Sequence, residues 1–226
     1  MNASAGRQED GRRGRGRAVR GTVLFATLFL CVWTAWIEPG WIEVTRHDVT
    51  LDVRAPLTVM HLTDLHTSGL GRRERRLLRI VRAERPDAVV ITGDCVTATG
   101  DYGPVAALVT EITAAAAPAP VFVVRGNWEL WRPLPAFGED ERAFYADAGA
   151  RLLVNESAEL PGGAWLVGLD DLGGRPAPGA ALSGVPSGAP AIAAFHSPAY
   201  FDALQEAFPD RCAVALAGHA HGGQVR

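Results

Sequence analysis

The chain has 226 residues, 48% of them hydrophobic, with three cysteines and a formal net charge of −3. This apolar fraction excludes a disordered chain, and the length allows one folded domain with an appendage. Basic residues concentrate in residues 1–20, where six Arg outweigh two acids, so the rest is acidic and a poor partner for nucleic acid. No CxxC spacing is present, which argues against a zinc knuckle or a disulfide framework.

The N-terminal 40 residues predict a membrane anchor. Residues 1–20 form an Arg/Gly-rich arm that we expect to be disordered, and residues 21–40 contain an uncharged run from Gly21 to Ile37. At about 1.5 Å per residue, this run just spans a hydrocarbon core. The run has no small-x-small cleavage site, which favours an uncleaved anchor over a signal peptide, and the Arg arm places the body outside the cytoplasm at the cell membrane. The alternatives are a body that rests on the cytoplasmic face and a helix that lies in the membrane interface.

Residues 41–226 alternate strand-like apolar runs with amphipathic segments, which predicts one α/β domain. Strands are expected at 49–53 (an edge strand), 57–62, 87–92, 121–124, 151–154, 164–168, 191–195 and 213–217. Helices are expected at 72–84, 104–116, 140–147 and 200–207. Residues 173–190 are rich in Gly and Pro and predict a loop with at most one helical turn.

Metal-ligand residue types follow five of these strands. They are Asp64, His66, Asp94, Asn127, His196, His219 and His221. Parallel strands joined by helices bring such ends to one edge of a sheet. Seven ligands are too many for one tetrahedral zinc and suit two divalent ions bridged by a carboxylate, for which Asp94 is central. Nitrogen and oxygen ligation without thiolate suits manganese, iron or zinc, with magnesium possible. His61 is expected in the core or beneath the ligands.

The ordered blocks resemble those of the calcineurin-like metallophosphoesterases over about residues 57–226. They read Asp64-x-His66, Gly93-Asp94, Gly126-Asn127, His196 and Gly218-His219-x-His221. The resemblance implies a β-sandwich flanked by helices that carries two metal ions. It assigns Asp64, His66, Asp94 and His221 to the first ion, and Asp94, Asn127, His196 and His219 to the second.

Two further stretches resemble the bacterial membrane-associated branch of that family, which includes UDP-2,3-diacylglucosamine pyrophosphatase-like enzymes. They are Leu169-Asp170-Asp171 and the ending Gly-His-Ala-His-Gly-Gly-Gln. The resemblance implies hydrolysis of a phosphodiester or phosphoanhydride by a metal-bridging hydroxide, in a lipid-linked or cell-envelope substrate. Asp94 and Asn127 would take part in catalysis, with Arg125 stabilising phosphoryl charge. The alternatives are an inactive, membrane-tethered metal-binding module and a phosphomonoesterase or phosphoprotein phosphatase.

The chain departs from the family pattern in two places. Trp128 stands where the family has a His that is regarded as the general acid or a phosphate contact. General acid help is worth roughly 10²–10⁴-fold, so we expect a preference for phosphoanhydrides, unless Glu129 substitutes. Trp128 and Trp131 form either an apolar wall for a lipid or a base, or ordinary core packing. The chain ends five residues after His221, so the last strands of the sandwich are expected to be missing.

Overall fold

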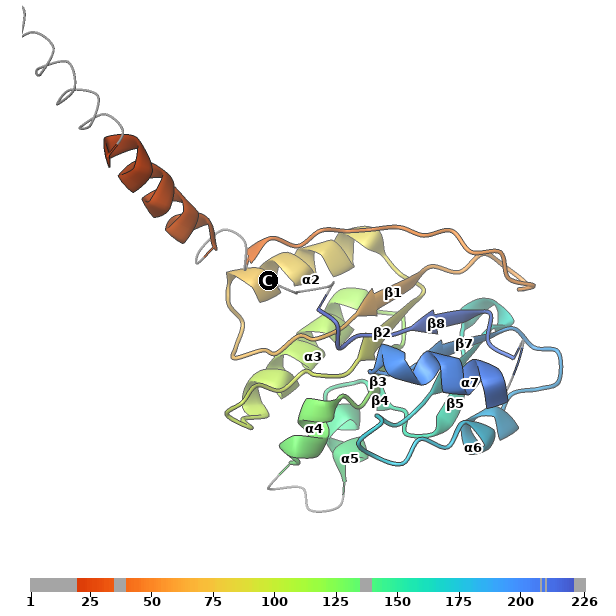
Figure 1. Cartoon of the computed structure of the whole chain (residues 1–226). Helices are drawn as coiled ribbons and strands as arrows, with labels where there is room; N and C mark the ends of the chain where they lie inside the picture. Colours follow the sequence, from red (N-terminus) through yellow and green to blue (C-terminus); the bar gives the residue numbers. More distant parts are fainter. Residues whose placement is uncertain (1–19, 35–39, 135–139, 208, 210, 222–226) are drawn as a thin grey trace, which may run out of the picture. The chain divides into compact units, whose positions relative to one another are not determined.

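The computed structural model describes residues 20–34, 40–134, 140–207, 209 and 211–221, and the predicted arm at 1–20 lies almost wholly outside them (Figure 1). The structure separates into two units, residues 1–44 and residues 45–226. In the first unit, residues 20–34 are helical and expose apolar side chains such as Leu24, Phe25 and Leu28. Within the described residues no helix combines the length and apolarity needed to cross a membrane, so the predicted transmembrane anchor is not supported.

The second unit contains two four-stranded sheets, with strand orders β1-β2-β3-β4 and β5-β6-β7-β8. The first sheet consists of β1 (Val59–Leu62), β2 (Ala88–Thr92), β3 (Val121–Val124) and β4 (Arg151–Leu152). The second consists of β5 (Glu156–Glu159), β6 (Trp165–Gly168), β7 (Ala191–Ala194) and β8 (Val214–Leu216). All neighbouring strands are parallel except β5 and β6. Within each sheet, the carboxyl ends of the parallel strands therefore share one edge.

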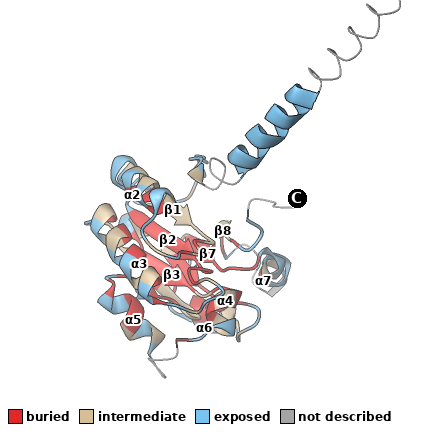
Figure 2. Cartoon of the chain, turned by 90° about the vertical axis from the view of Figure 1, so that its left-hand side faces the viewer, coloured by how far each residue is buried: buried red, intermediate tan, exposed pale blue. Residues whose placement is uncertain are grey.

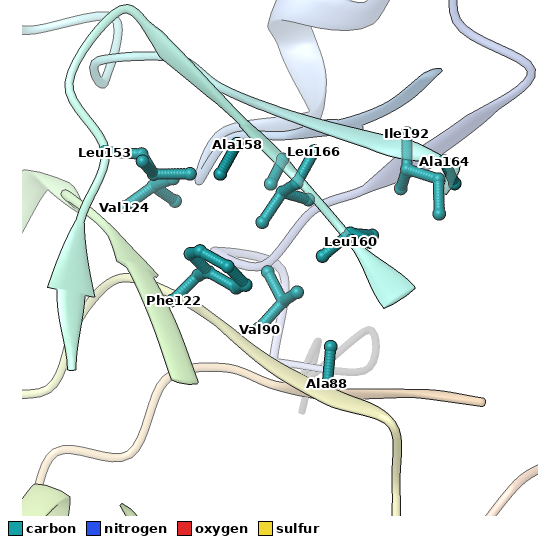
Figure 3. Close-up of a cluster of buried hydrophobic side chains, with 11 residues drawn as sticks. Ala88, Val90, Phe122, Val124, Leu153, Ala158, Leu160, Ala164, Leu166 and Ile192 are labelled. Atoms are coloured by element: carbon teal, nitrogen blue, oxygen red, sulfur yellow. The ribbon is translucent and has the colours of Figure 1, made fainter. Parts of the chain in front are cut away.

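The facing sides of the two sheets enclose the main apolar core (Figure 3). Alternate residues of β2 and β3, among them Val90 and Phe122, are buried against residues of the second sheet such as Leu166 and Ile192. Val90 and Phe122 pair in register, so their side chains lie on the same face, and Ala88 and Val124, each two residues along its strand, share that face. The architecture is therefore the predicted α/β sandwich.

Helices cover the outer faces. On the first sheet lie α2 (Arg72–Glu84) and α3 (Gly103–Ala116), with α5 (Glu141–Asp147) beside α3 and β4 (Figure 2). On the second sheet, α6 (Pro178–Ser183) and α7 (Phe201–Ala207) contribute side chains to a separate apolar cluster. Short 3-10 turns lie at Pro161–Gly163 and Pro198–Tyr200. A five-residue helix, α4 (Asn127–Trp131), follows β3.

The predictions of helix 72–84 and strand 121–124 are confirmed to the residue, and most others to within three residues. The predicted edge strand at 49–53 is wrong, because residues 49–53 form no ladder with either sheet. Their alternation has another cause: Leu51 and Val53 pack on the core between the sheets. The helix α4 and the strand β5 were not predicted.

Candidate metal centre

Three glycines let the ligand-bearing loops approach one another. Gly93, Gly126 and Gly218 each stand directly before a predicted ligand. A Cβ on Gly93 would collide with the backbone of Gly126, and a Cβ on Gly126 would collide with Asp94. A Cβ on Gly218 would collide with the hydroxyl of Thr63. The Gly-Asp, Gly-Asn and Gly-His pairs therefore have a steric origin: no larger residue fits where these loops touch.

Most of the predicted ligands sit on strained backbone. Among the described residues, seven other than glycine have positive φ, and five of them are predicted ligands: Asp64, His66, Asp94, His219 and His221. Such a conformation costs roughly 1–2 kcal/mol per residue and persists only where the surroundings enforce it. Two main-chain hydrogen bonds contribute, from Asp64 N–H to Gly93 O (3.1 Å) and from His66 N–H to Asp94 O (2.9 Å). Strain concentrated in this way is typical of functional sites.

The first group of ligand atoms comes from Asp64, His66, Asp94 and His221, all within 4.8 Å of one another. His66 Nε2 lies 3.6 Å from Asp94 Oδ2, and His221 Nε2 lies 3.2 Å from Asp64 Oδ1. The Nδ1–H of His66 donates to the Val96 carbonyl (2.9 Å), which leaves the lone pair of Nε2 facing the carboxylates. A second hydrogen bond of this kind is the usual way in which a metal-binding imidazole is oriented.

The second group is formed by Asp94, His196 and His219, joined by the side-chain oxygen of Asn127. His196 Nε2 lies 3.2 Å from Asp94 Oδ2, 3.0 Å from Asn127 Oδ1 and 3.2 Å from His219 Nδ1. His196 Nδ1 donates to the Thr92 carbonyl (2.7 Å), so in the neutral ring Nε2 is an acceptor.

The short distances around His196 Nε2 indicate whether a divalent cation fits among these atoms. With His196 neutral, its Nε2 and the facing oxygens of Asp94 and Asn127 direct lone pairs at one another, which is repulsive unless a proton or a metal ion intervenes. Burial opposes protonation of His196, yet the Asp94 carboxylate and the Thr92 carbonyl raise its pKa to about 9. Asp94 is buried too, but its hydrogen bonds to His196 and Trp128 lower its pKa. The donor set therefore fits a divalent cation.

Asp94 is shared by the two groups. Its Oδ2 faces both His66 and His196, while its Oδ1 accepts the main-chain N–H of Trp128 (2.9 Å). Asp94 is 1% exposed, whereas His219 and His221 are exposed residues. The candidate centre therefore has a buried carboxylate at its base and histidines on its solvent side, where a substrate could enter.

Two residues predicted to act in catalysis lie beside these groups. Both oxygens of Glu129 are held by main-chain N–H groups: Oε2 by Asp94 (2.9 Å) and Gly126 (2.8 Å), Oε1 by Cys95 (2.7 Å). Burial raises the pKa of Glu129, and these N–H donors oppose the rise. At 1% exposed, Glu129 is placed to join two ligand loops and has no free oxygen for a substrate.

Arg125 is likewise occupied. Its Nε donates to Glu141 Oε2 (2.6 Å) and its Nη1 lies 3.5 Å from Asp170 Oδ1. Burial lowers the pKa of the guanidinium, but the two carboxylates outweigh it and the pKa is raised. A guanidinium neutralised by two carboxylates is a weak partner for a phosphoryl group, so this geometry favours a structural role.

Several contributors to the site carry no sequence signal. The carbonyls of Thr92 and Val96 and the N–H of Trp128 act through the main chain, which every residue shares. Thr63 Oγ1 donates to Asp64 Oδ2 (2.8 Å) from the position beside the ligand. Only the adjacency of Thr63 to Asp64 could have indicated this contact.

The geometry agrees with a comparison to known families. The family model described as calcineurin-like phosphoesterase matches residues 57–223, well over half of the chain. A search among curated proteins finds no match. The matched range includes both groups of ligand atoms. The chain therefore belongs to the calcineurin-like phosphoesterase family, whose members are metal-dependent hydrolases of phosphoesters.

Proposed function

We propose that the chain binds two divalent cations and hydrolyses a phosphodiester or phosphoanhydride bond. The observation that carries this proposal is the shared position of Asp94 Oδ2 between two groups of ligand atoms. When bound, two such cations supply an activated water and neutralise phosphoryl charge. Manganese, iron and zinc suit this ligand set, and magnesium remains a weaker candidate.

Main-chain groups orient the side chains that would hold the cations. The carbonyls of Val96 and Thr92 fix the tautomers of His66 and His196, so that each presents Nε2 to the site. The N–H of Trp128 holds Asp94 Oδ1, which leaves Oδ2 free to help hold a cation. All these supports are main-chain groups that already hold the ligand side chains in the structure, as a preorganised site requires.

The residue at position 128 favours phosphoanhydrides as substrates. An indole N–H does not give up a proton to a leaving oxygen, so Trp128 cannot replace the histidine of the family pattern. Glu129 cannot replace it either, because its oxygens are bound to main-chain N–H groups. A phosphate leaving group needs less protonation than an alkoxide, which supports a UDP-2,3-diacylglucosamine pyrophosphatase-like reaction on a lipid-linked or cell-envelope substrate.

We also propose that the N-terminal helix attaches the protein to a membrane, with the catalytic domain outside the cytoplasm. Residues 20–34 expose Leu24, Phe25, Leu28 and Phe29 to solvent, and an apolar surface of this kind binds at a lipid interface. Co-sedimentation of the full chain with phospholipid vesicles tests the attachment. Replacing Leu28 by Asp should release the chain from the vesicles, whereas binding that is unaffected would contradict the proposal.

The hydrolase proposal is tested by metal content and turnover together. The purified chain, incubated with manganese and freed of excess ion, should retain close to two equivalents and cleave bis(p-nitrophenyl) phosphate. Asp94→Ala should lose both ions and activity, while Asp52→Asn, at an exposed carboxylate, should behave as wild type. Bound ions without turnover of any phosphoester would favour a metal-binding module, and turnover of monoesters alone would favour a phosphomonoesterase. Absence of bound ions would overturn the proposal.

A further inference from the structure

Two indoles stand beside the candidate metal centre on the short helix α4. The ring of Trp128 packs edge-on against the ring of His66, with centroids 5.4 Å apart. Trp131 lies three residues along the same helix, with its centroid 6.1 Å from that of Trp128 and the two rings tilted by 56°. Trp131 is 66% exposed, so the second indole lies nearer to solvent than the first.

Core packing does not explain this arrangement. Large aromatic side chains bury most of their surface when they serve the core, and Trp131 leaves two thirds of its own in water. Aromatic residues exposed next to a ligand site are typical of surfaces that recognise other rings. The pair therefore forms an aromatic ledge, Trp128 and Trp131, that starts at a metal-ligand histidine and extends outward.

The openness of the ledge distinguishes between two kinds of occupant. An acyl chain gains affinity by burial in an enclosed apolar volume, because its attraction is proportional to the area removed from water. A planar heterocycle stacks on one indole face and needs no enclosure. A ledge with one indole two-thirds exposed therefore suits a flat ring better than an acyl chain.

The position of the ledge sets the distance from ring to phosphate. A phosphoryl group held at the metal centre would lie next to His66, whose ring centroid is 5.4 Å from that of Trp128, and the more exposed ring of Trp131 is 6.1 Å from Trp128. A nucleotide carries its base one sugar away from its phosphate, so its base would lie beside the metal centre rather than in it, where these two indoles stand. We propose that Trp128 and Trp131 bind the base of a nucleotide-type substrate, and this inference rests on the proposed phosphoesterase function.

A matched pair of ligands isolates the base. UMP and ribose 5-phosphate carry the same phosphate on the same sugar, and only UMP carries a base. Calorimetric titration of the manganese-loaded full chain should give a dissociation constant for UMP roughly tenfold or more below that for ribose 5-phosphate, the order expected for one stacked base. UMP should also quench tryptophan fluorescence, and ribose 5-phosphate should not.

Variants assign the difference to the ledge. Trp131→Ala should bring the ratio of the two constants toward one with affinity for ribose 5-phosphate unchanged. Trp128→Ala should also lower the ratio, and Trp128→Phe should restore part of it. Trp128→Ala keeps the main-chain N–H that holds Asp94, and metal content measured in parallel shows whether the centre is intact. Phe201→Ala, at an exposed aromatic residue on α7, should leave the ratio as in wild type.

The outcomes separate this inference from the function on which it rests. If neither ligand binds the manganese-loaded chain, the proposed phosphoesterase function is refuted and the ledge with it. If both bind equally, or if Trp131→Ala leaves the ratio unchanged, only the ledge is refuted. Tighter binding of hexyl phosphate than of UMP would assign the ledge to an acyl chain and overturn the proposal of a base.

Discussion

Replacing Glu129 by Gln should loosen the metal centre without removing any ligand. The carboxylate accepts four main-chain N–H groups, two at each oxygen, from Asp94, Cys95, Val96 and Gly126 at 2.7–3.4 Å. Glutamine has nearly the same volume but one acceptor oxygen, so two buried N–H groups would face an NH₂ group. Each unsatisfied buried donor costs about 1–3 kcal/mol, which predicts a loss of roughly 2–5 kcal/mol in the free energy of unfolding. That is a large share of the total stability of a domain.

Urea unfolding of the metal-free protein at neutral pH measures this loss, because bound metal would add its own stabilisation. Manganese titration of the folded variant should show weaker binding, since Glu129 ties the loop of Asp94 to the loop of Gly126. Glu74→Gln is a control for loss of a buried carboxylate: Glu74 caps α2 by accepting the N–H of Gly71 (2.9 Å), which a glutamine oxygen can also accept. Its other oxygen accepts from the side chain of Arg73 (2.9 Å), so the substitution removes an ion pair but leaves no main-chain N–H unsatisfied. If Glu129→Gln unfolds at the wild-type urea concentration and binds manganese equally well, Glu129 does not hold the centre together.

Three further substitutions, at Trp128, His61 and Gly126, should change leaving-group preference, pH dependence and stability. Trp128→His should raise cleavage of an alkyl phosphodiester relative to a phosphoanhydride by about 100-fold, the lower range of general acid catalysis, and an unchanged ratio of kcat/KM would contradict the leaving-group argument. Burial lowers the pKa of His61 to about 4, although Asp64 opposes the shift. As the pH falls, His61 is therefore protonated in the unfolded chain before it is protonated in the folded protein. The contribution of His61 to the free energy of unfolding of the metal-free protein should therefore be fully present above pH 6.5 and fall by about 3 kcal/mol as the pH drops to 4; His61→Gln should flatten this part of the stability profile, and an unaltered slope between pH 6.5 and 4 would refute the assignment. Gly126→Ala should destabilise the fold by about 2 kcal/mol or more through collision with Asp94, whereas Gly40→Ala, where a Cβ meets nothing, should be neutral; equal urea midpoints would show that the loops can move apart.

The ligand set could be predicted because it depends on side-chain identity at the ends of regular elements. Strands such as Val121–Val124 are continuous apolar runs, and the helix Arg72–Glu84 has an apolar stripe, so their positions follow from periodicity. Once parallel strands were expected, residues after their ends had to share an edge. The structure brings Asp64 and Asp94 together after neighbouring strands of the first sheet, and His196 joins Asp94 from the end of β7 in the second sheet, so the expected single edge is formed by both sheets.

Other features depend on tertiary context that periodicity does not contain. The alternation of Leu51 and Val53 arises from core packing without strand pairing, so it predicted a strand that does not form. The strand β5 reads Glu-Ser-Ala-Glu, a polar stretch that pairs only because β6 lies beside it. The role of Glu129 is set by N–H groups of loops that become neighbours only in the fold.

One contact links the candidate centre to the architecture as a whole. The N–H of His219 donates to both oxygens of Asp64, at 3.0 and 3.2 Å, across 155 residues of chain. Asp64 follows β1 of the first sheet and His219 follows β8 of the second, so this hydrogen bond joins the two sheets at the side where the candidate centre lies. Loading the centre with cations should therefore tighten the association of the layers, and slowed amide exchange in β1 and β8 would register it.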